Sequence, residues 1–427
     1  MFDVIIVGGG ASGFYAAINI AEADPTLKIA ILEKGKDVLQ KVRISGGGRC
    51  NVTNAEQDPK ELVKNYPRGK KELLGPLYTH NSGDTIRFFE NRGITLKAES
   101  DGRVFPVSNS SQTIIDCFLN ETMRLGIKVF KHSAVTNIEP LGTKENADGW
   151  RITSIKNQYL GKKVLIAAGS NPKIWKILEH LGHSIVPPVA SLFTFKIDDE
   201  RISGIPGIAT NAKVDVLPKH AFGPELTLKL KSGHTPKALL SAEGPLLITH
   251  RGLCGPAVLN LSAWGAILMN EFKYRFPIRI NWLPDYHQGS ILPLLMEIKE
   301  IEAKKTVLRT NDLEIPKRLW AKLVKASGIA GDEKWAEVTK ERLQDLADQL
   351  TNCRFLVDGK SAFKEEFVTA GGVDLKEIDF KTFESKIHPN LFFAGEVINI
   401  DGITGGFNFQ NAWTGGYIAA QAIANKS

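Results

Sequence analysis

The sequence of 427 residues predicts an α/β fold, in which a Rossmann-like dinucleotide-binding domain contains both ends of the chain and is interrupted by an insertion. Three observations predict this class. An apolar segment at residues 2–7 runs directly into a glycine-rich pattern at residues 8–13. A second strand-like segment, residues 391–396, also precedes a glycine-rich stretch. From about residue 188 the periodicity changes to that of antiparallel strands and then to that of amphipathic helices.

The N-terminal pattern is G-x-G-x-x-G between a strand and the expected helix of residues 14–23. Gly8 permits the tight turn, Gly10 lets the backbone approach a pyrophosphate, and Gly13 lets the helix pack closely on the strand. Glu33 ends a second apolar strand, residues 28–32, about twenty residues beyond the last glycine, where a carboxylate can accept hydrogen bonds from an adenosine ribose. These features predict a cofactor with an adenosine diphosphate half, FAD and not FMN.

The C-terminal pattern predicts the opposite wall of the same flavin site. The strand at residues 391–396 ends in Gly395 and Glu396, and the glycine-rich residues 401–408 follow it. We expect a helix of small residues from about Ala412, whose positive end would face the flavin.

A third glycine-rich stretch, residues 45–51, follows the ribose acid. Three glycines inside a helix would cost about 1 kcal/mol each relative to alanine, so a loop is expected that approaches a ligand closely. Arg49 and Asn51 would be fixed beside it. For Cys50 we favour a packing role over that of a redox thiol, because no second cysteine is nearby in the sequence.

The residues expected to bind the cofactor lie in these glycine-rich turns or at the ends of neighbouring strands. They are Gly8, Gly10, Ala11, Ser12, Gly13, Glu33, Lys34, Lys41, Ser45, Gly46, Gly47, Gly48, Arg49, Cys50, Asn51, Val135, Ala168, Gly169, Gly395, Glu396, Asp401, Gly405, Gly406, Phe407 and Asn408. No metal site is expected. No catalytic acid or base stands out, and His250, the best polar candidate, is better explained by a structural role.

The periodicity predicts residues 1–187 and 354–427 as a discontinuous FAD-binding domain, 188–283 as an inserted β domain and 284–353 as an inserted helical domain. The expected elements of the insertion are strands at residues 192–197, 212–217 and 226–230, and helices at 290–305, 317–327 and 334–351. We expect the insertion to provide substrate selectivity without holding the cofactor, its loop at residues 249–256 being the best candidate to reach the substrate.

The formal charge of +7 is spread over a chain in which acids and bases alternate, and the densest basic stretch, residues 64–71, is interpreted as a solvated loop. We therefore expect a small-molecule substrate and no nucleic-acid partner. Four widely spaced cysteines indicate neither disulfides nor zinc. With no signal peptide or membrane-spanning run in the sequence, a cytoplasmic protein is expected.

The sequence resembles the YhiN-type flavoprotein family, which has a glutathione-reductase-like FAD fold. The resemblance rests on ISGGGRCNVTN at residues 44–54, THRGLCGP at residues 249–256 and the stretch 395–408, and it extends over nearly the whole chain. It implies tightly bound FAD, an insertion with a small β-barrel and a helical unit, and oxidase or reductase activity on small organic molecules. The family usually has serine at the position of Cys254, which puts a hydroxyl role there in doubt.

The main hypothesis is an FAD-dependent oxidoreductase that acts on a small organic substrate. The insertion contains no second G-x-G-x-x-G with a following acid, so NAD(P)H is expected only as a transient reductant. Two alternatives remain open: a flavin-containing, RNA-related nucleic-acid-binding protein, which the basic pI favours, and a redox partner of another protein without a metabolite substrate.

Overall fold

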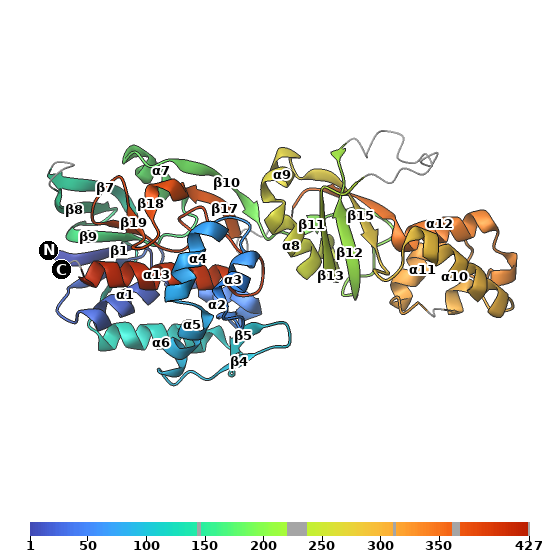
Figure 1. Cartoon of the computed structure of the whole chain (residues 1–427), viewed down its shortest axis with the longest axis horizontal. Helices are drawn as coiled ribbons and strands as arrows, with labels where there is room; N and C mark the ends of the chain where they lie inside the picture. Colours follow the sequence, from blue (N-terminus) through green and yellow to red (C-terminus); the bar gives the residue numbers. More distant parts are fainter. Residues whose placement is uncertain (143–146, 220–236, 311–312, 361–367, 426–427) are drawn as a thin grey trace. The chain divides into compact units, whose positions relative to one another are not determined.

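The computed structural model describes residues 1–142, 147–219, 237–310, 313–360 and 368–425. The chain divides into two compact units, one comprising residues 1–190 and 364–427 and the other residues 191–363 (Figure 1). The strand β16 (Cys353–Asp358) pairs with β15 (Arg275–Asn281) of the second unit. Residues 354–358 therefore belong to the inserted sheet and not to the returning FAD-binding half, where they were expected. Their side chains alternate between buried and exposed, and their backbone pairs with a strand more than 70 residues earlier in the sequence.

The first unit contains a sheet with the order β18-β19-β20-β9-β1-β2-β6, whose centre is parallel. Residues Val4 to Val7 and Ile29 to Leu32 are almost completely buried, so both strands lie within the hydrophobic core. The strands of this unit are β1 (Phe2–Val7), β2 (Ile29–Leu32), β3 (Thr53–Asn54), β4 (Leu96–Ala98), β5 (Arg103–Pro106), β6 (Lys128–Phe130), β7 (Val135–Gly142), β8 (Ala147–Ser154), β9 (Gln158–Ile166), β10 (Ile185–Ser191), β17 (Val368–Val373), β18 (Ile378–Asp379), β19 (Glu384–Ser385) and β20 (Leu391–Phe393).

The helices of the first unit cover this sheet. They are α1 (Ala11–Ala23), α2 (Gln40–Gly48), α3 (Pro59–Leu62), α4 (Lys70–Thr79), α5 (Ser82–Glu90), α6 (Ser111–Arg124), α7 (Pro172–His180) and α13 (Phe407–Asn425). Helices α1 and α13 lie side by side, although one is near the start of the chain and the other near residue 420 (Figure 1). Small residues permit this approach: a Cβ on Gly416 would lie only 3.1 Å from the Ser12 carbonyl oxygen.

Helix α13 begins at Phe407, so the expectation that it begins near Ala412 is wrong. Phenylalanine and asparagine are weak helix formers, and tertiary contacts fix this helix start instead. The Tyr66 hydroxyl donates to the Phe407 carbonyl at 2.7 Å, and the Asn408 side chain exchanges two hydrogen bonds with the backbone of Gly402. Phe407 and Asn408 are consequently the first residues of the helix.

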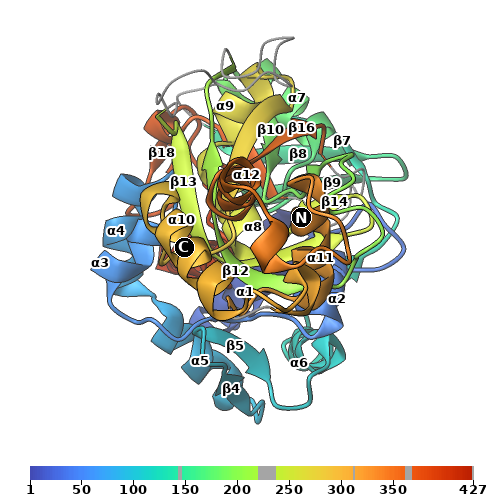
Figure 2. The same ribbon diagram turned by 90° about the vertical axis from the view of Figure 1, so that its right-hand side faces the viewer.

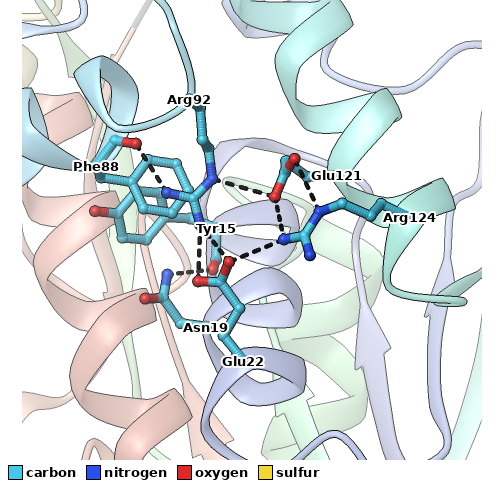
Figure 3. A network of polar contacts seen from close by, with 7 residues as sticks. All are labelled: Tyr15, Asn19, Glu22, Phe88, Arg92, Glu121 and Arg124. Carbon is cyan, nitrogen blue, oxygen red and sulfur yellow. Dashed lines mark hydrogen bonds and ion pairs between the residues drawn. The ribbon is translucent and has the colours of Figure 1, made fainter.

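A network of charged groups ties α1 to α5 and α6 (Figure 3). The guanidinium of Arg92 donates to both carboxylate oxygens of Glu22 at 2.7 Å, lies 3.4 Å from the Glu121 carboxylate, and covers the Phe88 ring at 3.7 Å. Arg124 contacts the same two carboxylates. Since the Arg92 side chain is only 12% exposed, this network fixes α6 against α1 more firmly than a solvated ion pair could.

The second unit contains a six-stranded antiparallel sheet with the order β11-β14-β13-β12-β15-β16. Its two edges meet: Phe195 bridges to Lys360, and the Lys196 N–H donates to the Gly359 carbonyl at 3.0 Å. The small β-barrel implied by the family resemblance is thereby present. The additional strands are β11 (Phe195–Lys196), β12 (Ala209–Val216), β13 (Leu240–Thr249) and β14 (Gly252–Cys254); the strand expected at residues 226–230 lies outside the described residues.

The helices of the second unit are α8 (Pro256–Trp264), α9 (Ala266–Glu271), α10 (Gln288–Ile301), α11 (Lys317–Ala326) and α12 (Lys340–Thr351). Helix α8 packs on β13, and α10, α11 and α12 form a group at one end of this unit, seen from the side in Figure 1 and from the front in Figure 2. The short helix η3 (Val307–Arg309) packs on α11, where the Trp320 indole N–H donates to the Val307 carbonyl at 3.0 Å. Within the described part of the chain, no helix is both long and apolar enough to span a membrane.

Candidate functional site

Eleven of the 25 expected cofactor residues follow the carboxyl ends of four neighbouring parallel strands, β2, β1, β9 and β20. Backbone hydrogen bonds hold these ends together: the Gly8 N–H donates to the Leu32 carbonyl at 2.9 Å, and the Ala394 N–H donates to the Ile166 carbonyl at 3.0 Å. In open α/β sheets, ligands bind in the crevice beyond the carboxyl ends of the strands. The structure thus brings the segments 8–13, 33–34, 168–169 and 395–396 to one edge of the sheet.

The three glycines of the first turn differ in what surrounds them. Gly8 has a φ of +121°, and a Cβ there would lie within 3 Å of the Ala167 and Ala168 backbone. A Cβ on Gly13 would collide with the Gly8 carbonyl oxygen. Around Gly10, in contrast, no atom lies within 4 Å of the place of a Cβ. Two of the glycines are therefore required by the fold, whereas Gly10 borders open space at the N-terminus of α1.

Glu33 is held in the turn by the backbone. Its carboxylate accepts the N–H groups of Gly9 at 2.9 Å and of Gly35 at 2.7 Å, a structural role that the sequence did not reveal. The segment before Val135 lies beside it, because the Ser133 N–H donates to the Glu33 carbonyl at 2.8 Å. Lys34 is exposed on the turn that follows.

Residues 45–51 leave the helical conformation, as the sequence predicts. Helix α2 is interrupted at Ser45, and Gly46, Gly47 and Gly48 all have positive φ. The places of a Cβ on the last two of these glycines are open, with no atom within 4 Å. The side chain of Arg49 is held by residues outside this loop. Its guanidinium donates to Glu99 at 2.7 Å and lies over the Phe105 ring at 3.9 Å.

Cys50 has the environment of a packing residue. It is completely buried, and burial raises the pKa of its thiol to about 12, with a smaller opposing effect of Ser45. At neutral pH the group is therefore a thiol and not the nucleophilic thiolate. Cys117 and Cys353 are likewise buried free cysteines.

The start of α13 lies directly against residues 52–54. The Asn54 amide donates to the Gly405 carbonyl at 3.1 Å, and the Trp413 indole N–H donates to the Val52 carbonyl at 2.8 Å. A Cβ on Gly406 would collide with the Thr53 backbone. The glycine-rich loop at residues 45–51 and the start of α13 are consequently neighbours, although the sequence separates them by more than 350 residues.

Two ion pairs join the segments that were predicted separately. Lys41 pairs with Glu396, whose carboxylate also accepts the Thr369 N–H at 2.9 Å. Arg68 pairs with Asp401 through two of its nitrogens, and the Asp401 side chain is fully buried. Arg68 was not among the residues expected at the site, because no local pattern in the sequence relates it to residue 401.

Within the described part of the chain, Oδ1 of Asn399, between the Glu396 and Asp401 segments, and two further side-chain oxygens nearby are buried without a hydrogen-bond partner. The two further oxygens are Oδ1 of Asn51, at the end of the glycine-rich loop, and Oδ1 of Asn411, in the second turn of α13. An orphaned polar atom costs about 1–3 kcal/mol, so each favours a ligand or an ordered water in its place. The spacing FNFQNAW at residues 407–413, with three polar residues in a helix start, is the sequence signal that could have indicated Asn411.

A buried polar network behind the helix start also escaped the sequence analysis. Gln410 Oε1 accepts hydrogen bonds from Thr53 at 2.6 Å and from Thr85 at 3.0 Å, while its amide donates to Thr414 at 3.0 Å. The Thr414 hydroxyl donates to the His80 carbonyl at 2.8 Å. The network fixes α13 against α4 and α5.

His80 completes this network with its ring. Nε2 lies 2.9 Å from the Tyr15 hydroxyl, and the imidazole stacks on the Tyr417 ring at 4.3 Å. Burial lowers the pKa of His80 to about 4, while Asp84 raises it and Arg87 lowers it by smaller amounts. The imidazole is therefore neutral at neutral pH.

We expect the protein to lose about 2 kcal/mol of stability through His80 between pH 7 and pH 5. The unfolded chain takes up the proton near pH 6.5 and the folded chain only near pH 4, so stability present above 6.5 is lost as the pH falls towards 4. Urea unfolding at both pH values would compare the wild type with His80→Gln, whose amide oxygen can accept the Tyr15 hydrogen bond without titrating. An equal pH dependence of the two proteins would contradict a neutral buried imidazole.

The remaining candidates lie in the second unit. His250 is exposed in the turn between β13 and β14, and Cys254 is half-buried in β14. Among the described residues, no group of histidine, cysteine, aspartate and glutamate side chains is arranged to hold a metal ion.

The fold and the glycine-lined edge of its sheet are those of a Rossmann-type flavoprotein oxidoreductase, and FAD is the cofactor of this class. The chain belongs to the family described as HI0933-like protein Rossmann domain, which it matches over residues 2–422.

Named relatives cover almost the whole chain. The ribosomal RNA dihydrouridine synthase of Haemophilus influenzae is 28% identical over 99% of this chain and 98% of its own length. The 3-dehydro-bile acid delta(4,6)-reductase of Clostridium scindens is 26% identical over 99% of this chain and 98% of its own length. Among solved structures, 3-ketosteroid delta1-dehydrogenase from Sterolibacterium denitrificans has the same fold, with a TM-score of 0.51, 12% identity and complete coverage of both chains.

Proposed function

We propose that FAD is held at the edge of the parallel sheet by the three glycine-rich segments. The open space at Gly10, together with the N–H groups at the start of α1, suits the pyrophosphate. Glu33, already fixed by two backbone N–H groups, suits the ribose. The open glycines 47 and 48 and the orphaned oxygens of Asn51 and Asn411 suit the flavin end.

The residues of this chain would orient the cofactor and set the electrostatics around it. The positive end of α13, which starts after two glycines of positive φ, would stabilise negative charge beside it. When bound, FAD supplies the two-electron chemistry that no side chain can perform. Lys41 and Glu396, which pair across the site, would fix its two sides relative to each other.

We further propose that the reaction is the reduction of a carbon–carbon double bond conjugated with a carbonyl group. Both named relatives act on such a bond: uracil has it within the ring, and a 3-dehydro-delta(4,6) bile acid has it in the steroid. Reduction adds two electrons and two protons across the double bond, and NAD(P)H is the reductant we propose. The single observation that supports this chemistry is the full-length similarity to two reductases whose substrates otherwise differ.

Uracil in ribosomal RNA is the substrate that we favour. The relative with the higher of the two identities is named for this substrate, and the net charge of +7 suits a polyanion. From the sequence alone RNA is only an alternative, because a net charge of +7 without related proteins does not identify a partner. An RNA substrate also agrees with the cytoplasmic location expected from the sequence.

A free small enone is the second candidate, which agrees with the original expectation of a small organic substrate. The bile acid reductase, also similar over its full length, supports it. This candidate would require only the FAD-binding segments and an apolar pocket.

One experiment tests both. The FAD-loaded protein is reduced anaerobically with NADPH or NADH, and the absorbance of the flavin is followed after addition of unmodified ribosomal RNA or of a 3-keto-4,6-diene steroid. We expect RNA to reoxidise the protein and to gain two hydrogen atoms on a uracil, measured by mass spectrometry of the digested RNA. Reoxidation by the steroid alone would favour the second candidate, and reoxidation by neither would overturn the proposed reaction.

A further inference from the structure

Two of the four cations in the densest basic stretch of the sequence, residues 64–71, form ion pairs in the fold. Lys64 pairs with Glu61 at 2.6 Å, and Arg68 pairs with the buried Asp401. Lys70 and Lys71 are exposed and have no ion pair with a described residue, so two adjacent lysines are what this stretch offers to a polyanion.

Helix α11 in the second unit provides a larger basic surface. Its sequence KRLWAKLVKA contains four cations and no acid. At 100° per residue, Lys317, Arg318, Lys322 and Lys325 fall within one sector of about 140°. The opposite sector contains the buried residues Leu319, Trp320, Leu323 and Val324. We call the four cations the α11 basic face.

The α11 basic face has no close carboxylate partner among the described residues. Within the described part of the chain, no ion pair involves Lys317, Arg318, Lys322 or Lys325. Arg309, at the end of the short helix η3 that packs on α11, is a further exposed cation. The nearest acid in the sequence, Glu314, is exposed and precedes the helix.

This arrangement does not favour the stability of the helix itself. The first turn of a helix favours acids, because its N-terminus carries a positive partial charge. In α11 the first turn contains Lys317 and Arg318, no acid, and no side-chain cap at Pro316. The neighbouring helices are different: α10 has Glu297 and Glu300 around Lys299, and α12 mixes both signs. A basic face of one sign is thus a local feature of α11 and not a consequence of composition.

We propose that the α11 basic face binds the phosphate backbone of the RNA substrate, an inference that rests on the proposed function and assigns the contact to one helix. A row of cations along about 12 Å of helix is complementary to a chain of phosphates. Such contacts position an RNA without reading its sequence.

The test compares two variants with the same loss of charge. The first variant replaces Lys317, Arg318, Lys322 and Lys325 with glutamine. The control replaces four exposed lysines spread over the first unit with glutamine as well: Lys97, Lys128, Lys156 and Lys176. Filter binding of labelled, protein-free ribosomal RNA is measured for the FAD-loaded proteins between 50 and 200 mM salt, with thermal unfolding as the check on folding. We expect at least tenfold weaker binding by the first variant at about 150 mM salt and a salt slope smaller by about 3, and a change below twofold in the control.

Measurements of RNA reduction distinguish a failure of the α11 assignment from a failure of the proposed function. If the α11 variant reduces RNA with a raised KM and an unchanged kcat, the assignment is supported. If the wild type reduces RNA and the α11 variant binds it as well as the control does, the α11 assignment fails while the proposed function remains. If the wild type neither binds nor reduces RNA, both fail. Loss of binding to anionic phosphatidylserine vesicles, with RNA binding intact, would also overturn the proposal in favour of a membrane surface.

Discussion

Gly10→Val should fold normally and bind FAD at least a hundredfold more weakly than the wild type. Gly10 has a φ of −96° and a ψ of −168°, values that valine adopts without strain, and no atom lies within 4 Å of the place of its Cβ. The side chain would instead occupy the space in which we place the pyrophosphate. Equilibrium dialysis of the apoprotein with FAD measures the affinity, and urea unfolding of the apoprotein should show a change below about 1 kcal/mol.

Gly13→Ala provides the contrasting case. Its Cβ would collide with the Gly8 carbonyl oxygen, so this smaller substitution should lower the stability of the apoprotein itself. A Gly10→Val protein that purifies with a full complement of FAD would show that the cofactor does not approach this turn.

Arg68→Met should cost about 3–5 kcal/mol of unfolding free energy, because it removes the guanidinium that neutralises the fully buried carboxylate of Asp401. The matched control is Arg87→Met, which breaks an arginine–aspartate pair on the surface: the Arg87 side chain is 64% exposed, and its pair with Asp84 is expected to contribute less than about 1 kcal/mol. Urea unfolding measures both. Similar losses from the two substitutions would mean that the pair between residues 68 and 401 does not hold the start of the C-terminal segment.

The parts of the fold that sequence predicts are those specified by neighbouring residues. Residues 2–13 contain a buried strand, a turn with its glycines and the start of a helix in direct succession, and the structure has all three. The same holds for the loop at residues 45–51, where consecutive glycines exclude a regular helix. Both ends of the chain were correctly assigned to one sheet, because each ends an apolar strand in a glycine.

The parts that escaped prediction depend on partners far away in the sequence. The start of α13 is fixed by Tyr66, and strand β16 is defined by pairing with β15. The buried network around Gln410 and His80 joins residues that are more than 300 positions apart. In the same way, charge counting along residues 64–71 could not show that Asp401 neutralises Arg68.

The contact between α1 and α13 has a consequence for the order of folding. Gly416 of α13 lies against Ser12 in the first turn of α1, where a Cβ on the glycine would be 3.1 Å from the Ser12 carbonyl oxygen. During synthesis, α1 therefore leaves the ribosome long before the helix against which it packs, and the whole inserted unit emerges in between. Contacts of such long range form slowly, so we expect the first glycine turn to remain incompletely packed until its distant partner has formed. Cofactor capture would then be one of the last events in the maturation of this chain.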